Sequence, residues 1–293
     1  MKTNLFSGVG TALITPFRAD GTIDEEALCT LVDEQAESGV DFLCVLGTTA
    51  ETPTLAHAER RRVFEIVRDR TAGRLPLLMG AGGNNTAAVC ETVKALPEGV
   101  DGVLIVAPYY NKPSQEGLFR HFQAVAAASP VPVVLYNVPG RTGVNMTAET
   151  TLRIARECPN AVAIKEASGD TAQITAVIDG APAGFCVLSG DDALALELIK
   201  RGAKGLISVV SNAYPRRCTR MVHAALAEQW KEAEAGDNEL RPLYKPLFAD
   251  GNPAGIKHVL ALAGKCENVL RLPLTPVGNE TARQLADLAL NPE

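Results

Sequence analysis

Lys165 is the residue of this sequence whose surroundings point most directly to chemistry. It follows the apolar run 161–164, which contains Val and Ile, and the small or turn-forming residues 167–169 come after it. Such a run predicts a buried strand. A buried ammonium is costly, so an amine at the dry end of that strand tends to lose its proton and become a nucleophile. The alternative is a lysine that extends to solvent, or pairs with Glu166, at a strand end.

Other polar groups also follow apolar runs. They are Thr48 and Thr49 after residues 42–46, Tyr109 and Tyr110 after residues 102–106, Tyr136 and Arg141 at and beyond the end of residues 131–137, and Asp191 and Asp192 after residues 185–188. If these runs are the strands of a barrel, their carboxyl ends share one rim, which is where barrels do chemistry. A lysine, tyrosines, threonines and an arginine would then converge.

This set suits a small carboxylate that carries a carbonyl. Residues 47–49 offer amides and hydroxyls to a carboxylate, although a plain turn explains them equally well. Tyr136 could pass protons during imine formation, or be a core tyrosine with a satisfied hydroxyl. Arg141 could hold a second carboxylate, or be a solvated loop charge. Asp191 and Asp192 oppose a phosphate, which disfavours phosphorylated sugars and pyridoxal phosphate.

We expect no metal, no disulfide frame and no catalytic histidine. His57, His121, His223 and His258 fall within helical patterns, and no histidines and carboxylates cluster at metal-ligand spacing. The seven cysteines are odd in number and form no Cys-x-x-Cys pair, as in a reduced, cytoplasmic protein.

The composition is that of an ordinary globular protein and excludes several classes of partner. Of the 293 residues 46% are hydrophobic and 21% charged, and the formal charge is −6. A broad nucleic-acid footprint needs a basic face, so no nucleic acid is expected. No apolar run approaches the roughly 18 residues of a membrane span. Residues 1–4 lead into folded-looking sequence, which argues against a signal peptide.

The elements that must position these groups alternate regularly. Eight apolar runs are followed in turn by helical patterns. The runs are 8–14, 42–46, 75–79, 102–106, 131–137, 162–165, 185–188 and 205–210. This alternation predicts an α/β fold, a (β/α)₈ or TIM barrel. A doubly wound sheet competes, but it usually carries a glycine fingerprint after its first strand, where this sequence has Thr15-Pro16-Phe17.

After about Asn212 the strand pattern stops. We expect a catalytic barrel domain over residues 1–220 and a C-terminal helical appendage over 221–293. The helices expected there are 221–235, a weaker one at 240–248 interrupted by Pro242 and Pro246, one from Asn252 to about Ala263, and a last one at 280–290, with a linker at 236–238.

Five motifs, in order at the expected rim, resemble those of the dihydrodipicolinate synthase family. They are Gly47-Thr48-Thr49-Ala50-Glu51, the run from Pro108-Tyr109-Tyr110-Asn111 to Gly117, Tyr136-Asn137-Val138-Pro139-Gly140-Arg141-Thr142-Gly143, Ile164-Lys165-Glu166-Ala167-Ser168-Gly169 and Leu188-Ser189-Gly190-Asp191-Asp192. This family lies within the pyruvate-dependent class I aldolases, which also include N-acetylneuraminate lyase. The resemblance covers nearly the whole chain.

The resemblance implies a reaction and a role for each residue. Lys165 would form a Schiff base with pyruvate and need no cofactor, and the enamine would condense with aspartate 4-semialdehyde to give 4-hydroxy-tetrahydrodipicolinate for lysine and diaminopimelate synthesis. Thr48 and Thr49 would bind the pyruvate carboxylate, and Thr49, Tyr136 and Tyr110 would relay protons. The remaining implied substrate-binding groups are Arg141 for the semialdehyde carboxylate and the backbone carbonyls of Gly190 and Ile207.

The resemblance also implies an assembly. Tyr110 would reach into the site of a neighbouring subunit, so that a homodimer is the minimal unit and a tetramer, a dimer of dimers, the usual one. The nearest alternative is a sister pyruvate aldolase or lyase that acts on a sugar acid, against which Arg141 and Thr48 speak. A non-catalytic barrel that senses a carboxylate would be expected to lack the lysine or the tyrosine.

Two departures from the family pattern matter. Ala50 stands where the family usually has glycine, and would cost about 1 kcal/mol if that position needs a positive φ. His57, Asn84 and Tyr109 match the family's allosteric lysine site, but Ala88 stands where lysine-sensitive members carry glutamate, and Arg60 where they often carry histidine. We therefore predict weak or absent inhibition by lysine.

Overall fold

The computed structural model describes residues 5–288, and its eight strands form a closed parallel barrel in chain order. Residues 1–4, and the last two residues of the final predicted helix, 289 and 290, lie outside this range. The strands are β1 (Gly8–Ala12), β2 (Phe42–Val45), β3 (Leu77–Gly80), β4 (Gly102–Val106), β5 (Val133–Asn137), β6 (Ala161–Glu166), β7 (Cys186–Ser189) and β8 (Gly205–Ser208). The barrel prediction is confirmed, and a doubly wound sheet is excluded.

The helices of the barrel follow its strands. They are α1 (Glu25–Glu37), α2 (His57–Thr71), α3 (Thr86–Lys94), α4 (Gln115–Ala128), the short α5 (Pro139–Thr142), α6 (Ala148–Glu157), α7 (Thr171–Gly180) and α8 (Ala195–Lys200). Side-chain caps define several of their starts, since Asp24 accepts from the Ala27 amide and Ser114 accepts from the Gly117 amide. Because parallel strands are buried on both faces, they appear in the sequence as nearly continuous apolar runs.

Contacts divide the chain into two compact units, which we describe separately. The first consists of the residues up to Gly8 together with Pro76–Ile207, and we call it the Lys165 unit. The second consists of Val9–Leu75 and the residues from Ser208 on, and we call it the Thr49 unit.

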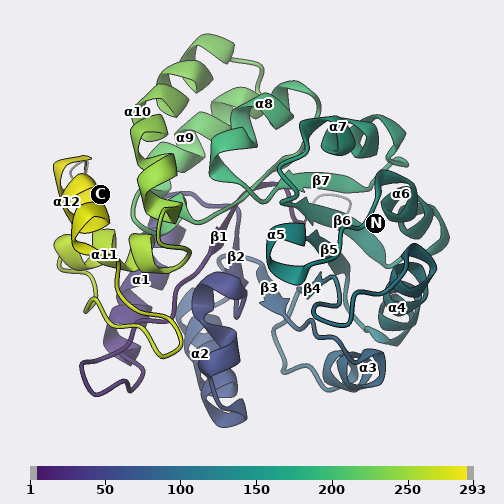
Figure 1. Cartoon of the computed structure of the whole chain (residues 1–293), viewed down its shortest axis with the longest axis horizontal. Helices are drawn as coiled ribbons and strands as arrows, with labels where there is room; N and C mark the ends of the chain where they lie inside the picture. The colour runs from purple at the N-terminus through teal and green to yellow at the C-terminus, as the bar shows by residue number, and fades with distance from the viewer. Residues whose placement is uncertain (1–4, 289–293) are drawn as a thin grey trace. The chain divides into compact units, whose positions relative to one another are not determined.

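In the Lys165 unit, β5, β6 and β7 are neighbours (Figure 1), and their parallel register aligns their ends. Tyr136 lies opposite Lys165, and Asn137 lies opposite Glu166. On the other side of β6, Lys165 lies opposite Leu188 of β7. The register therefore places Tyr136 and Lys165 side by side at the carboxyl end of the sheet.

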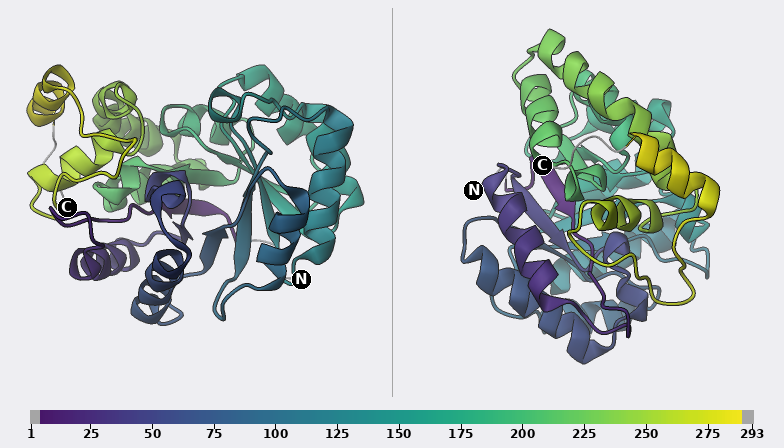
Figure 2. Two further views of the ribbon diagram at one scale, coloured as in Figure 1. Left: turned by 60° about the horizontal axis from the view of Figure 1, so that its bottom comes forward. Right: turned by 90° about the vertical axis from the view of Figure 1, so that its left-hand side faces the viewer.

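The Thr49 unit contains β1, β2, α1, α2 and the last four helices of the chain. These helices are α9 (Pro215–Leu226), α10 (Trp230–Phe248), α11 (Ala254–Leu262) and α12 (Asn279–Leu288). Figure 2 shows the light-green part of the C-terminal segment, around α11, passing close to the N-terminal segment in purple. An ion pair between Lys265 and Glu34 joins the two segments (2.8 Å).

The predicted linker at residues 236–238 is wrong, because α10 runs through it and through both prolines. A hypothetical Cβ on Gly236 would lie 2.9 Å from the Cβ of Met221, so the glycine allows α9 and α10 to pack closely. Asp237 is buried and accepts a hydrogen bond from the Tyr244 hydroxyl (3.0 Å). Packing therefore outweighs the weak helix propensity of this segment. The predicted domain boundary, between 220 and 221, falls inside α9.

Over the described range, no helix combines the length and apolarity needed to cross a membrane.

Candidate active site

Lys165 is buried at the carboxyl end of β6, with a relative exposure of 5%. Its Nζ lies 4.6 Å from the centre of the Tyr136 ring. Within residues 5–288 no carboxylate forms an ion pair with it. The snorkelling and salt-bridge alternatives are therefore both excluded, and the amine is buried beside the aromatic ring of Tyr136.

Glu166 points away from Lys165, as the alternation of side chains along a strand requires. Its carboxylate accepts hydrogen bonds from the side-chain amide of Asn137 (3.2 Å) and from the backbone amide of Ser168 (2.8 Å). The residue is fully buried, and this burial raises the pKa of its carboxyl group. The adjacent lysine and glutamate therefore occupy different environments.

Gly190 leaves room for the lysine side chain. A hypothetical Cβ at this position would lie 2.7 Å from the Cβ of Ala167 and 3.1 Å from Cε of Lys165. The Gly190 amide donates to the carbonyl of Glu166 (2.7 Å), which holds the loop after β7 against the end of β6. Ile207 is buried in β8. A larger residue at 190 would crowd the nucleophile.

Tyr110 is the most exposed large hydrophobic residue of the described chain, at 88%. Its backbone is in the left-handed region (φ 72°), and its amide donates to the carbonyl of Thr142 (3.3 Å). Arg141 is exposed on α5, which directly follows β5. The loop after β4 is thereby joined to α5, while the Tyr110 ring projects into solvent.

Thr48 and Thr49 belong to the Thr49 unit, in the short 3₁₀ helix η1 (Thr48–Ala50). Thr49 is buried, and its hydroxyl accepts a hydrogen bond from Nδ2 of Asn252 (2.9 Å). Ala50 has helical geometry, and the positive φ of this segment falls on Glu51 (54°) instead. The strain considered for alanine at position 50 therefore does not arise.

Glu51 is anchored by a buried ion pair that the sequence analysis missed. The Nζ of Lys257 donates to Oε1 of Glu51 (2.5 Å) and to the carbonyl of Val269 (2.9 Å), and both charged side chains are fully buried. The amide of Arg271 donates to Oε2 of Glu51 (3.0 Å). Burial lowers the pKa of Lys257, while the Glu51 carboxylate opposes that shift.

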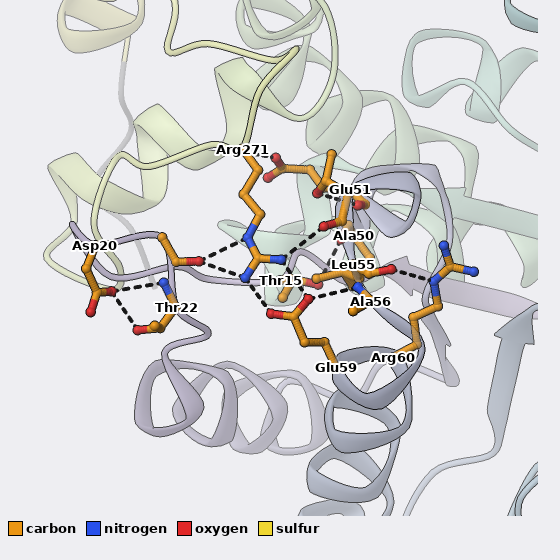
Figure 3. A network of polar contacts seen from close by, with 12 residues as sticks. Thr15, Asp20, Thr22, Ala50, Glu51, Leu55, Ala56, Glu59, Arg60 and Arg271 are labelled. Atoms are coloured by element: carbon orange, nitrogen blue, oxygen red, sulfur yellow. Dashed lines mark hydrogen bonds and ion pairs between the residues drawn. The ribbon is translucent and has the colours of Figure 1, made fainter.

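Arg271 extends this anchor to the start of α2 (Figure 3). Its guanidinium binds both carboxylate oxygens of Glu59 (2.6 and 2.8 Å) and the carbonyls of Gly21 and Thr54. The hydrogen bonds from Arg271 are the main reason that the pKa of Glu59 falls to about 2. No local sequence signal pairs residues more than 200 positions apart, so these contacts could not have been foreseen.

The residues of the predicted lysine site fall in both units. In the Lys165 unit, Asn84 donates to the carbonyl of Tyr109 (3.2 Å), and Ala88 is exposed on α3. In the Thr49 unit, His57 begins α2, and Nε of Arg60 donates to the carbonyl of Leu55 (3.0 Å). The structure thus joins Asn84 to the backbone of Tyr109 within the Lys165 unit.

The histidines and cysteines form neither a disulfide nor a metal cluster in the part of the chain that the structure describes. His121 is buried beside Thr86 (2.9 Å), and burial lowers its pKa to about 4. His223 pairs with Asp41 (2.7 Å). All seven cysteines are free. Among the residues that the structure describes, no three His, Cys, Asp or Glu side chains come together as a metal site would require.

Comparison with known proteins identifies close relatives. Residues 5–291 match the Dihydrodipicolinate synthetase family. A 4-hydroxy-tetrahydrodipicolinate synthase of Parabacteroides distasonis is 51% identical over 282 residues, which cover 96% of this chain and 95% of that protein. The crystal structure of a dihydrodipicolinate synthase from Thermotoga maritima has a TM-score of 0.95 at 41% identity and covers 97% of this chain and 98% of its own. A structure described as the first monomeric dihydrodipicolinate synthase variant also has a TM-score of 0.95 at 41% identity, with 98% and 96% covered.

Proposed function

The chain belongs to the dihydrodipicolinate synthetase family, and we propose that it joins pyruvate to aspartate 4-semialdehyde through an imine on Lys165. The activity is that of a 4-hydroxy-tetrahydrodipicolinate synthase, a lyase of lysine and diaminopimelate biosynthesis. The observation that carries the mechanism is a buried amine at a strand end, beside Tyr136, that forms no ion pair with any carboxylate of residues 5–288.

The proposed first half-reaction forms an enamine. Nζ of Lys165 attacks C2 of pyruvate, the two protons of the amine pass in turn to the former carbonyl oxygen, and water leaves to give the imine. Loss of a proton from C3 then gives the enamine. The protons move through Thr49, Tyr136 and Tyr110, and Thr48 and Thr49 bind the pyruvate carboxylate. A positioned hydroxyl relay typically contributes about 10²–10⁴-fold to such proton transfers.

The proposed second half-reaction releases the enzyme. Enamine C3 attacks the aldehyde carbon of the semialdehyde, and the new alkoxide is protonated. The substrate's amino group then attacks C2 and displaces Lys165, which closes the ring of 4-hydroxy-tetrahydrodipicolinate. One water is lost overall, and no cofactor takes part. Arg141 binds the semialdehyde carboxylate through its planar guanidinium, and Gly190 and Ile207 contribute backbone carbonyls.

Borohydride reduction in the presence of pyruvate tests this mechanism. We expect the reduced pyruvate adduct on the peptide that contains Lys165, and none without pyruvate. Lys204, an exposed lysine of the same unit, is the internal control and should stay unmodified. An adduct on a different lysine, or no adduct, would overturn the assignment. Turnover of the semialdehyde but not of sugar-derived aldehydes would distinguish this activity from that of a sister aldolase.

We propose further that Tyr110 acts in a second copy of the chain, which makes a homodimer the minimal unit and a tetramer the full assembly. Supporting this, the Tyr110 ring is 88% exposed on a backbone held in the left-handed region. Mixing a Tyr110→Phe protein with a Lys165→Ala protein tests it, because a mixed dimer would contain one intact site. Recovered activity after subunit exchange supports the proposal, and persistent inactivity in a proven mixed dimer contradicts it.

The proposed compartment is the reducing cytoplasm. Seven free cysteines, three of them only partly buried, would be prone to oxidation in a disulfide-forming compartment. Fractionation of the native host, with the enzyme assayed in each fraction, tests this placement.

A further inference from the structure

Asn252 makes a specific contact with a residue of the proposed proton relay. It lies just before α11, and its Nδ2 donates to Oγ1 of Thr49 at 2.9 Å, although the two residues are 203 positions apart. Thr49 is 2% exposed and Asn252 is 9% exposed. Among the described residues, the Asn252 amide is the one hydrogen-bond partner of the Thr49 hydroxyl. The contact is thus buried and directional.

The backbone around Thr49 is already held by other groups. The Thr15 hydroxyl donates to the carbonyl of Ala50 (2.9 Å), and the Thr52 hydroxyl donates to the carbonyl of Gly47 (2.9 Å). Lys257 holds the side chain of Glu51, two residues further along the chain. The contact with Asn252 is therefore not needed to place the loop, and the freedom that it restricts is rotation of the Thr49 hydroxyl.

The direction of this hydrogen bond has a chemical consequence. A threonine hydroxyl has one hydrogen to donate and two lone pairs that accept. When the amide of Asn252 occupies one lone pair, the hydrogen must be donated to another group, and one lone pair remains to receive a proton. We propose that Asn252 is a positioning residue that sets the direction of the Thr49 hydroxyl for proton transfer. This inference rests on the proposed function of Lys165 and Thr49.

Asn252→Asp tests the inference because it keeps the shape and replaces the donor by an acceptor. The Thr49 hydrogen would then be drawn to the carboxylate and lost to the relay. We expect C3–H exchange of pyruvate in D₂O, followed by NMR, and kcat to fall together by about 10- to 100-fold. The KM for pyruvate should change by less than about threefold, since the loop stays in place.

Matched variants separate this role from a structural one. Asn268→Asp makes the same change in the same C-terminal segment, at an amide bonded to His258 (3.3 Å), and should exchange pyruvate protons at the wild-type rate. Asn252→Ala, made in parallel, adds no charge and should show a smaller loss of exchange. In a Thr49→Val background, either Asn252 change should have little further effect, because the hydroxyl that it orients is gone.

The outcomes are distinguishable. Undiminished exchange in folded Asn252→Asp, or an equal loss in the Thr49→Val background, would overturn the positioning role. If Asn252→Asp does not fold, wild-type exchange rates in Asn252→Ala would overturn it, and slowed exchange that depends on Thr49 would support it. Failure of wild-type protein to form the imine on Lys165 would instead overturn the proposed function.

Discussion

Two regions of the molecule use a buried lysine and a buried glutamate in opposite ways. Lys165 and Glu166 are neighbours in sequence, yet the lysine lies against Tyr136 while the glutamate is held by Asn137 and the Ser168 amide. Lys257 and Glu51 are 206 positions apart, yet they form a fully buried ion pair. Because they are neighbours on one strand, Lys165 and Glu166 point to opposite sides. The tertiary fold brings Lys257 and Glu51 together.

The difference teaches that burial alone does not make a lysine a nucleophile. A buried ammonium that is held by a carboxylate stays a cation and stabilises the fold, because removing its partner would leave an uncompensated charge. A buried amine without such a partner can give up its proton and attack a carbonyl. The absence of an anionic partner among the described residues is thus as informative about Lys165 as its burial.

The largest expected effect separates activity from stability. Lys165→Met should abolish imine formation and lower kcat by about three orders of magnitude or more, because no other amine replaces the nucleophile. Its free energy of unfolding in urea should stay equal or rise, since a buried polar amine becomes an apolar side chain. Lys204→Met, at an exposed position of the same unit, should keep both properties. Retained turnover in Lys165→Met would contradict the mechanism.

For Lys257 the main expected effect is on stability instead. Lys257→Met should lower the free energy of unfolding by roughly 3–5 kcal/mol, because Glu51 is left buried and charged. The double variant with Glu51→Gln should recover part of that loss. Lys94→Met removes an exposed, solvent-screened pair with Glu91 and should leave the unfolding curve close to that of the wild type. An unfolding curve for Lys257→Met that matches Lys94→Met would show that the buried pair is not an anchor.

A smaller effect concerns the dependence of stability on pH. Burial raises the pKa of Glu166 above its ordinary value of 4.5, so the folded protein holds this proton more tightly than the unfolded chain. Stability from this group is present below pH 4.5 and is lost as the pH rises through the raised pKa. Relative to Glu166→Gln, the wild-type protein should therefore lose stability as the pH rises above about 4.5 toward the raised pKa. Paired urea titrations across this range check the sign, and a wild-type gain with pH would contradict it.

The smallest expected effect concerns inhibition of the enzyme by free lysine. The ammonium of lysine would meet Ala88 where sensitive relatives offer a carboxylate, so we predict little inhibition of the enzyme at about 1 mM lysine. Ala88→Glu should increase sensitivity. Ala87→Glu adds the same charge at a neighbouring exposed position of α3, which faces a different direction, and should not. Strong inhibition of the wild-type enzyme at sub-millimolar lysine would refute this prediction.

Sequence patterns predicted the ends of the strands well and the helices of the C-terminal segment less well. The end of β5 at Asn137 and both ends of β4 were predicted correctly, because strands buried on both faces leave continuous apolar runs. The interruption predicted at Gly236 was wrong, because the close packing of that glycine against Met221 favours a helix that local propensity does not. Propensity is a weak local signal, and packing overrides it.

The sequence by itself determined the barrel and the position of Lys165 at a strand end, because strands buried on both faces leave continuous apolar runs that alternate with helical patterns. Only the tertiary structure decided which groups surround each charged residue. It gave Lys257 a carboxylate, left Lys165 beside an aromatic ring, and brought Asn252 to the hydroxyl of Thr49. The physical reason is that hydrogen bonds and ion pairs act over a few ångströms in space, so residues more than 200 positions apart leave no local pattern of their pairing.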